Sequence, residues 1–386
     1  MKYLKLCINE WVNANRDKRE CSVVRELGAD VSVIAKGPVS GVKEEVAGFS
    51  VTRLSPRPLG KKMPVLLNRV VSMFTWAAYV RKQNYDIISG HDYVALTIAW
   101  ISNVGKRCKA ILVYDSHEFE LGRSVNRGRF ATWCLCHWER FLMRRCAFSI
   151  MVNDAIADEV QRIHRLEQRP VVVRNIPNYW RLDETKISAT RKEILSALGL
   201  SEETFLVMYH GAVVHDRGIE NMLRAVAKME GTAAVVLGNG AEDYLFSLRN
   251  LCEELGVKNR TLFLPAVPVE TLYRYVGAAD VEAALIVGKF KSYYFSLPNK
   301  IFEAIQSLTS LVVSDFPEMG RLIGQYGIGL KIDPTKEEEI VDAFTRLRDD
   351  KEFCAQCKEN LKRAKEDLCW EREQEALKAA YREIIK

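Results

Sequence analysis

The sequence predicts an α/β protein made of two Rossmann-like domains, each built on a parallel sheet. Its 386 residues exceed what one ordinary domain holds. Both halves alternate short apolar segments, typical of strands, with longer segments of helical period. The composition, 48% hydrophobic and 27% charged, is that of a globular protein. No segment reaches the roughly 18 apolar residues that a membrane-spanning helix needs.

The first elements predict a parallel βαβ unit. Residues 3–8 and 31–35 read as strands, and residues 16–27 between them as a helix that ends at a glycine. The polar loop that includes Asn15 and Arg16 falls where such a sheet opens its ligand crevice. No G-x-G-x-x-G follows the first strand, so the fingerprint of a dinucleotide cofactor is absent.

Two further strands end in ionisable side chains. Residues 86–89 lead into His91 and Asp92, and residues 110–114 lead into His117 and Glu118. The carboxyl ends of parallel strands meet at one edge of a sheet, which is where such folds bind ligands. The alternative for Asp92 is a structural one, in which its side chain caps the helix that follows.

Composition places the domain boundary near residue 185. Residues 171–173 read as a short strand, and the polar segment 179–203 after it reads as a linker. We therefore expect domains at 1–185 and 186–368. The chain closes with helices at about 335–348, 351–365 and 369–385, the last of them in the segment 369–386.

The second half begins with a candidate anion site. A strand at 205–209 is followed by Gly211, Ala212 and Arg217, and a strand, a glycine and a helix start together form an anion cradle. Strands at 235–237 and 262–264 lead into further loops. The first of these loops carries Gly240 as an additional candidate, although a single G-x-G is equally typical of a tight turn.

The stretch 293–318 reads as loop, helix, strand and loop. Pro298 suits a helix start, Ser296 is a candidate N-cap, and Lys300 and Glu303 lie in the first turns. Free N–H groups and the positive end of the dipole make such a helix start an anion site. The alternative is an ordinary capped helix with a surface Lys and Glu.

Several segments resemble one enzyme family. SLPNKIFEAI and VVSDFPEM, together with ISGHDYVAL and LVYDSHEFE, are similar to the retaining glycosyltransferases of the two-Rossmann (GT-B) fold. The likeness is to the large family 4, which includes sucrose synthases and many bacterial polysaccharide transferases. It implies two Rossmann-like domains facing across a cleft, with the C-terminal helix returning to the first domain.

The resemblance also implies roles for particular residues. His117 would contact the transferred sugar near the reacting centre, and Arg217 and Lys300 would neutralise the donor diphosphate during catalysis. Glu303 would hold the donor ribose. The remaining donor contacts and the acceptor or sugar contacts would come from two sets of residues. They are Gly211, Ala212, Gly240, Ala266, Val267, Ser296, Leu297, Pro298 and Asn299 for the donor, and Asn15, Arg16, His91, Asp92 and Glu118 for the acceptor or sugar.

Two positions depart from the family pattern. Phe295 stands where the family usually has the first Glu of its E-x7-E motif, and Ala212 stands where it usually has Arg. Without that first Glu no residue is an obvious nucleophile, which favours retention by front-face departure and attack. No convincing D-x-D loop is present, so we expect no metal and no cofactor, with a nucleotide sugar, most simply a UDP-sugar, as substrate.

Four functions remain open at this stage. The favoured one is transfer of a sugar from that donor to a glycan or lipid-linked acceptor in the synthesis of surface polysaccharide or glycoconjugate. A nucleotide-sugar epimerase would share the fold. A catalytically inactive subunit, bound to a partner protein, is consistent with Phe295 and Ala212. A plain nucleotide-binding module is the remaining alternative.

The first half of the chain is strongly basic. Residues 1–180 hold 28 Lys and Arg against 17 Asp and Glu, a net charge of +11, whereas the remaining residues carry −5. The basic residues of 55–83 and 123–145 are interleaved with aromatic ones, as is typical of contact with an anionic membrane. The alternative is a solvated surface over core aromatics. No nucleic-acid-binding module accompanies the charge. We expect a cytoplasmic protein, peripheral at the inner face of the cell membrane.

Overall fold

The computed structural model describes residues 1–11, 15–60, 62–122, 128–288 and 290–385. Within these ranges the chain divides into two compact units. The first unit comprises Met1–Asn175 and the chain from Glu373 onward, and the second comprises Ile176–Arg372. The division therefore falls at Asn175, before the expected residue 185.

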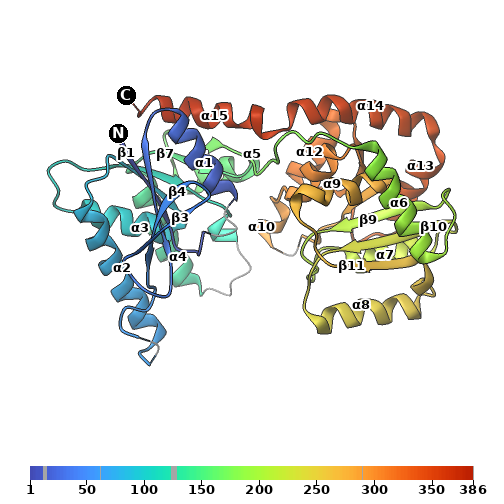
Figure 1. Cartoon of the computed structure of the whole chain (residues 1–386), viewed down its shortest axis with the longest axis horizontal. Helices are drawn as coiled ribbons and strands as arrows, with labels where there is room; N and C mark the ends of the chain where they lie inside the picture. Colours follow the sequence, from blue (N-terminus) through green and yellow to red (C-terminus); the bar gives the residue numbers. More distant parts are fainter. Residues whose placement is uncertain (12–14, 61, 123–127, 289, 386) are drawn as a thin grey trace. The chain divides into compact units, whose positions relative to one another are not determined.

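The first unit is built on an eight-stranded sheet, in the order β3-β4-β2-β1-β5-β6-β7-β8 (Figure 1). The strands are β1 (Lys2–Cys7), β2 (Asp30–Lys36), β3 (Val42–Val46), β4 (Phe49–Leu54), β5 (Ile87–His91), β6 (Ile111–Asp115), β7 (Cys146–Met151) and β8 (Val171–Val172). All neighbours pair in parallel except β3 and β4, an antiparallel hairpin at the sheet edge that the sequence analysis did not anticipate.

Helices of the first unit connect and cover these strands. They are α1 (Asn15–Glu26), α2 (Val65–Lys82), α3 (Asp92–Asn103), α4 (Arg129–Met143), α5 (Asp154–His164), the single turn η1 (Glu120–Gly122) and most of α15 (Trp370–Arg382). Strand β1 is buried over five of its six residues, as is expected of a central parallel strand.

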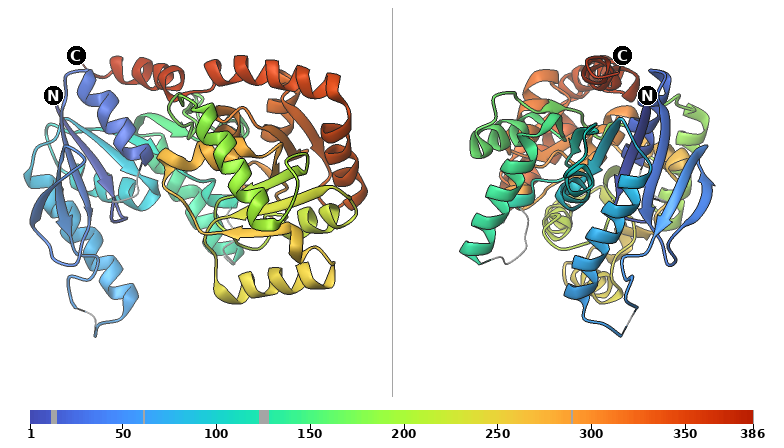
Figure 2. Two further views of the ribbon diagram at one scale, coloured as in Figure 1. Left: turned by 45° about the vertical axis from the view of Figure 1, so that its right-hand side comes forward. Right: turned by 90° about the vertical axis from the view of Figure 1, so that its left-hand side faces the viewer.

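The C-terminal helix α15 packs on α1 of the first unit (Figures 1 and 2). The Tyr381 hydroxyl donates a hydrogen bond to Glu20 of α1. Near the start of α15, the Arg174 guanidinium donates hydrogen bonds to both carboxylate oxygens of Glu373, with Nη2 2.7 Å from Oε2. A long-range contact of this kind fixes the end of the chain on the first sheet.

The second unit has a fully parallel six-stranded sheet, in the order β11-β10-β9-β12-β13-β14. Its strands are β9 (Phe205–His210), β10 (Thr232–Leu237), β11 (Thr261–Leu264), β12 (Val281–Ala284), β13 (Ser310–Ser314) and β14 (Gly329–Ile332). Alternate strand residues enter the two apolar clusters: Leu206 and Met208 belong to one, Val207 and Tyr209 to the other. Both faces of this sheet are therefore buried, as in the Rossmann-like domain that the sequence predicts.

Helices cover the second sheet. They are α6 (Glu184–Leu198), α7 (Ile219–Ala227), α8 (Glu242–Glu254), α9 (Val269–Ala278), α10 (Lys291–Tyr294), α11 (Asn299–Gln306), α12 (Pro317–Tyr326), α13 (Glu337–Asp349) and α14 (Lys351–Asp367), with the turn η2 (Lys258–Arg260). The expectation of a linker at 179–203 was wrong for most of its length. Helix α6 fills it, capped by the Asp183 side chain and closed by Gly199 in the left-handed conformation.

Candidate functional site

The predicted donor residues lie on loops that leave the carboxyl edge of the second sheet. Strands β10, β9 and β12 are neighbours in that sheet, and their following loops carry most of the predicted set. Backbone hydrogen bonds tie these loops together: Val213 N–H donates to the Asn239 carbonyl, and Val287 N–H donates to the Asp216 carbonyl, 3.0 Å away. This edge is where open parallel sheets bind ligands.

Two glycines bring the backbone close at this edge. Gly211 has a φ of 117°, and a Cβ added there would meet the Lys300 side chain at 3.8 Å. A Cβ on Gly240 would lie only 2.4 Å from the Val213 carbonyl oxygen. Glycine at 240 therefore has a packing reason, and glycine at 211 has a conformational one, its positive φ.

Lys300 is a buried cation at the start of α11. It is only 8% exposed, and its Nζ lies 3.2 Å from the centroid of the Tyr209 ring. A carboxylate oxygen of Glu282 is 3.9 Å away. Burial, with a smaller contribution from the nearby Arg217, lowers the pKa of Lys300 to about 7, although Glu282 and Glu303 oppose the shift. The ordinary surface lysine considered in the sequence analysis is therefore excluded.

Arg217 lies close enough to Lys300 to affect its pKa. It precedes α7, and its guanidinium carbon is 5.2 Å from the centroid of the Tyr293 ring. The two cations lie at the starts of different helices, α7 and α11, and their charges repel each other unless an anion lies between them. The structure thus brings together Gly211, Arg217, Lys300 and Glu303, all predicted as donor residues.

The sequence analysis missed His210 and Glu282, which complete this group. The His210 Nε2 donates to Glu303 Oε2 at 2.9 Å, and its Nδ1 lies 3.0 Å from Glu282 Oε2. Burial opposes the charge on His210, but Glu282 and Glu303 raise its pKa to about 9. A charged imidazolium therefore orients Glu303. A glutamate inside the apolar strand Val281–Ala284 was the signal that could have revealed this network.

The other predicted donor residues take more peripheral positions. Ser296 does not cap α11, because its hydroxyl donates to the Tyr293 carbonyl, and Pro298 occupies the N-cap position instead. Asn299 is exposed and Leu297 packs against the apolar core. The Ala212 carbonyl accepts a hydrogen bond from the Tyr209 hydroxyl at 2.6 Å.

Ala266 and Val267 lie on the loop that follows β11. The Ala266 N–H donates to the Asn239 side chain at 3.0 Å, and Val267 packs against the apolar core. These contacts tie the loop to its neighbour after β10. They leave the role that the resemblance implies for both residues as a prediction.

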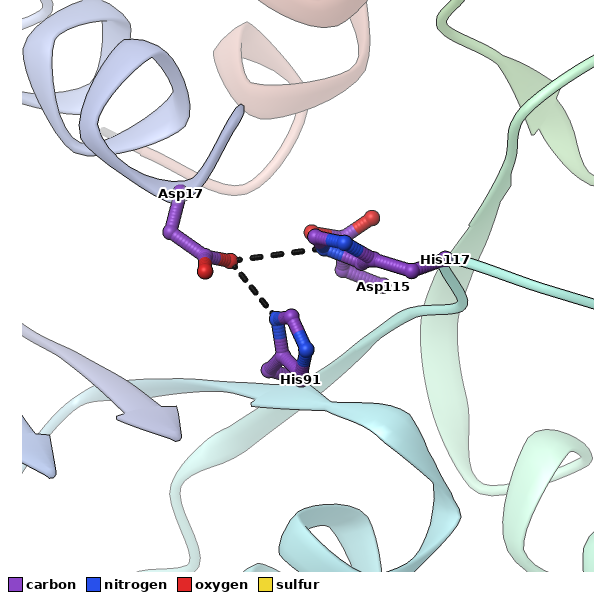
Figure 3. Close-up of side chains that lie close together, drawn as sticks. All are labelled: Asp17, His91, Asp115 and His117. Atoms are coloured by element: carbon purple, nitrogen blue, oxygen red, sulfur yellow. Dashed lines mark hydrogen bonds and ion pairs between the residues drawn. The ribbon is translucent and has the colours of Figure 1, made fainter. Parts of the chain in front are cut away.

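The first unit gathers a second group of ionisable side chains at the carboxyl edge of its sheet. His91 ends β5 and Asp115 ends β6, and the two are paired in the register of these strands. Figure 3 shows His91 and His117 converging on Asp17 of α1. His91 Nδ1 donates to Asp17 Oδ1 at 2.9 Å, and His117 Nε2 lies 3.1 Å from Asp115 Oδ2. The ring centroids of the two histidines are 3.7 Å apart.

A fully buried lysine lies behind the two histidines. Lys5 Nζ is 2.8 Å from Asp115 Oδ2 and 3.1 Å from Asp17 Oδ1, and it also pairs with Glu20. Burial alone would lower the pKa of Lys5, but Asp115, Glu20 and Asp17 raise it well above its usual value. Three carboxylates therefore hold this lysine permanently charged.

The same cation keeps the carboxylates ionised. Burial would raise the pKa of Asp17, but Lys5 and the hydrogen bonds from His117 and His91 hold it well below its usual value. Asp115 likewise has a pKa well below its usual value, since Arg16 and Lys5 outweigh its burial. An ionised carboxylate can only accept a hydrogen bond. The ring nitrogens of His91 and His117 that face Asp17 and Asp115 therefore carry a proton and donate.

Arg16 lies within this cluster. Its guanidinium donates twice to Asp115 Oδ1, at 2.8 and 3.1 Å, and once to the Val173 carbonyl. The side chain is 8% exposed. It is therefore built into the scaffold of the site, whereas the sequence analysis placed it among the acceptor contacts.

The two aspartates and two histidines also have the chemistry of metal ligands. One ligand atom from each of Asp17, His91, Asp115 and His117 lies within 4.8 Å of the others. The Lys5 ammonium already contacts both carboxylates, so an internal cation supplies the positive charge that a metal would bring. The expectation of a metal-independent enzyme stays a prediction.

The remaining first-unit candidates separate into structural and exposed residues. Asp92 caps α3, since its Oδ1 accepts from the N–H groups of Val94 and Ala95, which is the structural alternative considered above. Glu118 has an exposed side chain. Residues 13 and 14 of the predicted crevice loop, and the side chain of Asn15, lie outside the described residues.

The sequence analysis also missed Lys5, Asp17 and Glu20. A lysine within the buried strand Lys2–Cys7 was the available signal, because a charge in such a strand requires partners. Which partners it finds depends on the order of strands β1, β5 and β6, and that order is not written in any local pattern.

The basic and aromatic residues that the sequence analysis assigned to membrane contact include both exposed and inward-packed side chains. Phe130 and Trp133 of α4 are 77% and 56% exposed, whereas Trp138 packs inward and donates to Thr97 Oγ1 at 2.9 Å. Arg140 donates to the Ile163 carbonyl, so it is structural. Lys61, Arg123 and Arg127 lie outside the described residues. Among the helices that are described, none has the length and apolar character to cross a membrane.

Two protein-family models match the chain, one on each unit. Residues 21–177 match the glycosyl transferase 4-like domain, and residues 190–364 match the glycosyl transferases group 1 domain. An uncharacterized glycosyltransferase of Methanocaldococcus jannaschii is 24% identical over 344 residues, which is 84% of this chain and 81% of the relative.

Solved structures agree on the fold. Sucrose-phosphate synthase of Thermosynechococcus elongatus superposes with a TM-score of 0.78 at 15% identity, covering 100% of this chain and 99% of that one. Anabaena HepE in complex with UDP-glucose gives a TM-score of 0.74 at 17% identity, covering 99% of each chain. The chain therefore belongs to the glycosyltransferases of the GT-B fold, with a 4-like first domain and a group 1 second domain.

Proposed function

We propose that the protein is a retaining, metal-independent glycosyltransferase that uses a UDP-sugar. Its acceptor would be a glycan or a lipid-linked glycan in the synthesis of surface polysaccharide or glycoconjugate. The observation that carries the proposal is the group formed by Gly211 after β9, Arg217 before α7, and Lys300 and Glu303 of α11. The structure of Anabaena HepE with UDP-glucose supports the choice of a uridine diphosphate donor.

The second unit is suited to bind the donor diphosphate. Lys300 is buried with its nearest carboxylate oxygen 3.9 Å away, so its charge is only partly compensated. An incoming diphosphate would supply the missing negative charge, and the N–H groups at the start of α11 would add their dipole. Glu303, oriented by His210, would accept hydrogen bonds from the ribose hydroxyls.

The same cations suit the chemistry of transfer. When the bond between the sugar and the diphosphate breaks, negative charge develops on the leaving phosphate, and Lys300 and Arg217 stabilise it. Phe295 offers no carboxylate for a covalent intermediate. Retention would then proceed by attack on the face from which the diphosphate departs, with the leaving phosphate accepting the proton of the acceptor hydroxyl.

In the first unit, His91 and His117 would orient the acceptor and the transferred sugar. Burial opposes protonation of His117, but Asp115 and the hydrogen bonds to it and Asp17 raise its pKa. A histidine that retains its proton is better suited to donate a hydrogen bond to a sugar oxygen than to act as a base. We therefore assign it to orientation.

The basic first unit would also hold the protein at anionic membrane. The exposed aromatics Phe130 and Trp133, next to the arginines of α4, are typical of interfacial contact. Sedimentation with vesicles tests this: binding should require anionic lipid and weaken as salt rises. Binding that ignores both variables would contradict it.

A panel of nucleotide sugars tests the donor proposal. UDP-sugars should raise the melting temperature more than GDP- or ADP-sugars, because a ligand of the folded state stabilises it. The stabilising donor is then incubated without acceptor. An epimerase would isomerise it, whereas a transferase would leave the sugar configuration unchanged and transfer it only when an acceptor is added. A donor that binds yet supports neither reaction would indicate an inactive partner subunit.

A further inference from the structure

A large apolar cavity lies on the outer surface of α3 in the first unit. Its volume is about 830 Å³, within the range of small-molecule sites. Helix α3 contributes Tyr93, Ile98 and Ile101 to the lining of the cavity. Helices α2 and α4 both contact α3, and the right-hand view of Figure 2 shows them on either side of it. Trp138 of α4 closes one wall.

One end of this cavity begins at the edge of the sheet that carries the histidines. Asp92, which lines the cavity, directly follows His91, and Ile8, another lining residue, directly follows β1. The apolar cavity therefore borders the strand ends that carry the polar cluster of Lys5, His91 and His117. A ligand that occupied both would need a polar head and an apolar tail.

The wall formed by α2 is unusually apolar for an exposed helix. Only Asn68, Trp76, Ala77 and Val80 are buried in it. Leu66 and Phe74, both lining the cavity, are 74% and 58% exposed. Apolar surface gathered in this way is typical of a binding groove, because an ordinary helix faces such residues toward the core.

A cation also lines the cavity. Arg69, on the same helix, is exposed and contributes to the wall. Lys62 is exposed just before the helix begins. Basic groups beside an apolar groove complement an amphiphile whose head bears phosphate, and they are unfavourable for a neutral apolar partner.

We propose that this cavity binds the hydrocarbon chain of a phosphate-bearing lipid-linked acceptor, whose glycan head then reaches His91 and His117. The inference rests on the proposed transfer function and selects, from the two acceptor classes it allows, the lipid-linked one. The chain lies along α3 against Ile98 and Ile101, and Arg69 meets the phosphate. Affinity then depends on chain length, by about fourfold for each added methylene.

Alkyl phosphates below their micelle concentration test the proposal on the whole chain. The cavity wall contains Trp76, Trp100 and Trp138, so dodecyl phosphate brominated in its chain should quench tryptophan fluorescence in a saturable manner. Unbrominated octyl, decyl and dodecyl phosphate should displace it, each more tightly than the last. Inorganic phosphate is the control for binding of the head group alone.

Two variants of α2 distinguish binding in the cavity from binding to the rest of the helix surface. Val70, which lines the cavity, is 44% exposed, and Leu67, which does not line it, is 42% exposed. Val70→Asp should weaken binding of dodecyl phosphate at least tenfold, whereas Leu67→Asp should change it less than twofold. Both positions are exposed, so both variants should keep the melting temperature of the wild type.

Three results would overturn the proposal: no saturable quenching, affinity that ignores chain length, or equal loss in the two variants. Equal loss accompanied by binding to anionic vesicles would assign the apolar surface to the membrane itself. Calorimetric titration of the same variants with UDP gives an independent readout. Lost UDP binding with intact lipid binding would refute the donor assignment only, and the reverse would refute the lipid site only.

Discussion

Each unit buries a lysine at the carboxyl edge of its sheet, and the two lysines have opposite electrostatics. Lys5 contacts carboxylates of Asp17, Glu20 and Asp115, and its pKa is raised well above the usual value. Lys300 has its nearest carboxylate oxygen 3.9 Å away, and burial lowers its pKa to about 7. The charge of Lys5 is fully compensated, whereas the charge of Lys300 is compensated only in part.

The difference distinguishes scaffold from ligand site. A buried cation with all its partners in place stabilises its neighbours and attracts no further anion. A buried cation that lacks sufficient counter-charge is costly in the free protein, and that cost is relieved when an anion binds. Lys5 therefore orients the two histidines, whereas Lys300 has the electrostatics expected of a group that binds an anion, as the proposed function requires.

The largest expected effect is on stability. Lys5→Met leaves three buried carboxylates without their central cation and should destabilise the first unit by about 3–5 kcal/mol. Lys300→Met removes a poorly compensated charge and should be neutral or stabilising. Differential scanning calorimetry of both variants measures this, since it resolves separate transitions of a two-unit chain. Equal destabilisation by the two substitutions would contradict the distinction between them.

The next effect is on turnover. Arg217→Ala and Lys300→Ala should each lower kcat by roughly 10²-fold, because each removes a preorganised charge next to the leaving phosphate. The double variant should fall short of the product of the two effects if both contact the same phosphates. Steady-state kinetics with a saturating donor is the measurement. Lys258→Ala, at an exposed lysine paired with Glu253, is the control and should leave kcat unchanged. Near-normal kcat in the Lys300→Ala enzyme would show that the charge is supplied elsewhere.

A smaller effect concerns the donor ribose. Glu303→Ala should weaken UDP binding by about 1.5–3 kcal/mol, since it removes a charged hydrogen-bond acceptor. Glu303→Gln, which keeps an acceptor oxygen, should lose less. Calorimetric titration of both variants gives the affinities, and the melting temperature checks that the fold survives. Unchanged affinity in Glu303→Ala would remove this residue from the site.

The smallest effect is a pH dependence of stability. The pKa of His210 in the folded protein, about 9, lies above its ordinary 6.5, so its contribution to stability is complete below about pH 6.5 and is lost as pH rises through 9. The pKa of Lys300 is instead lowered from its ordinary 10.5 to about 7, so its contribution to stability increases as pH rises between these two values. Between pH 7 and 9 the two oppose each other. The melting temperature of Lys300→Met should therefore fall more steeply over this range than that of the wild type, and parallel curves would contradict the assignment.

Much of the fold could be predicted because its signals are local. Apolar strands alternating with helices, such as residues 3–8 and 31–35 around a helix, predict parallel sheets directly. The hairpin of Val42–Val46 and Phe49–Leu54 was not predicted, because β3 is exposed and rich in charge, which is atypical of a strand. Helix α6 was not predicted, because its polar composition resembles that of a linker.

The residues of the two candidate sites likewise divide into those with a local sequence signal and those without one. Lys300, Glu303 and Arg217 could be chosen from the sequence because each lies at a recognisable strand end or helix start. Lys5 and Glu282 could not, because the partners of a buried charge come from strands that are distant in sequence. Lys5 meets Asp115 across 110 residues, and only the order of strands brings them together.

Proton uptake on UDP binding tests the claim about Lys300 most directly. Calorimetric titrations at pH 8, in buffers of different ionisation enthalpy, report the number of protons taken up per UDP bound. At this pH the UDP phosphates are fully ionised, because their last pKa is about 6. With a pKa of about 7, Lys300 is mostly neutral before binding, and the diphosphate favours its charged form. We predict that the wild type takes up most of one proton and that Lys300→Met takes up almost none. Binding without proton uptake in the wild type, or equal uptake in the variant, would contradict the assignment of Lys300 to the donor diphosphate.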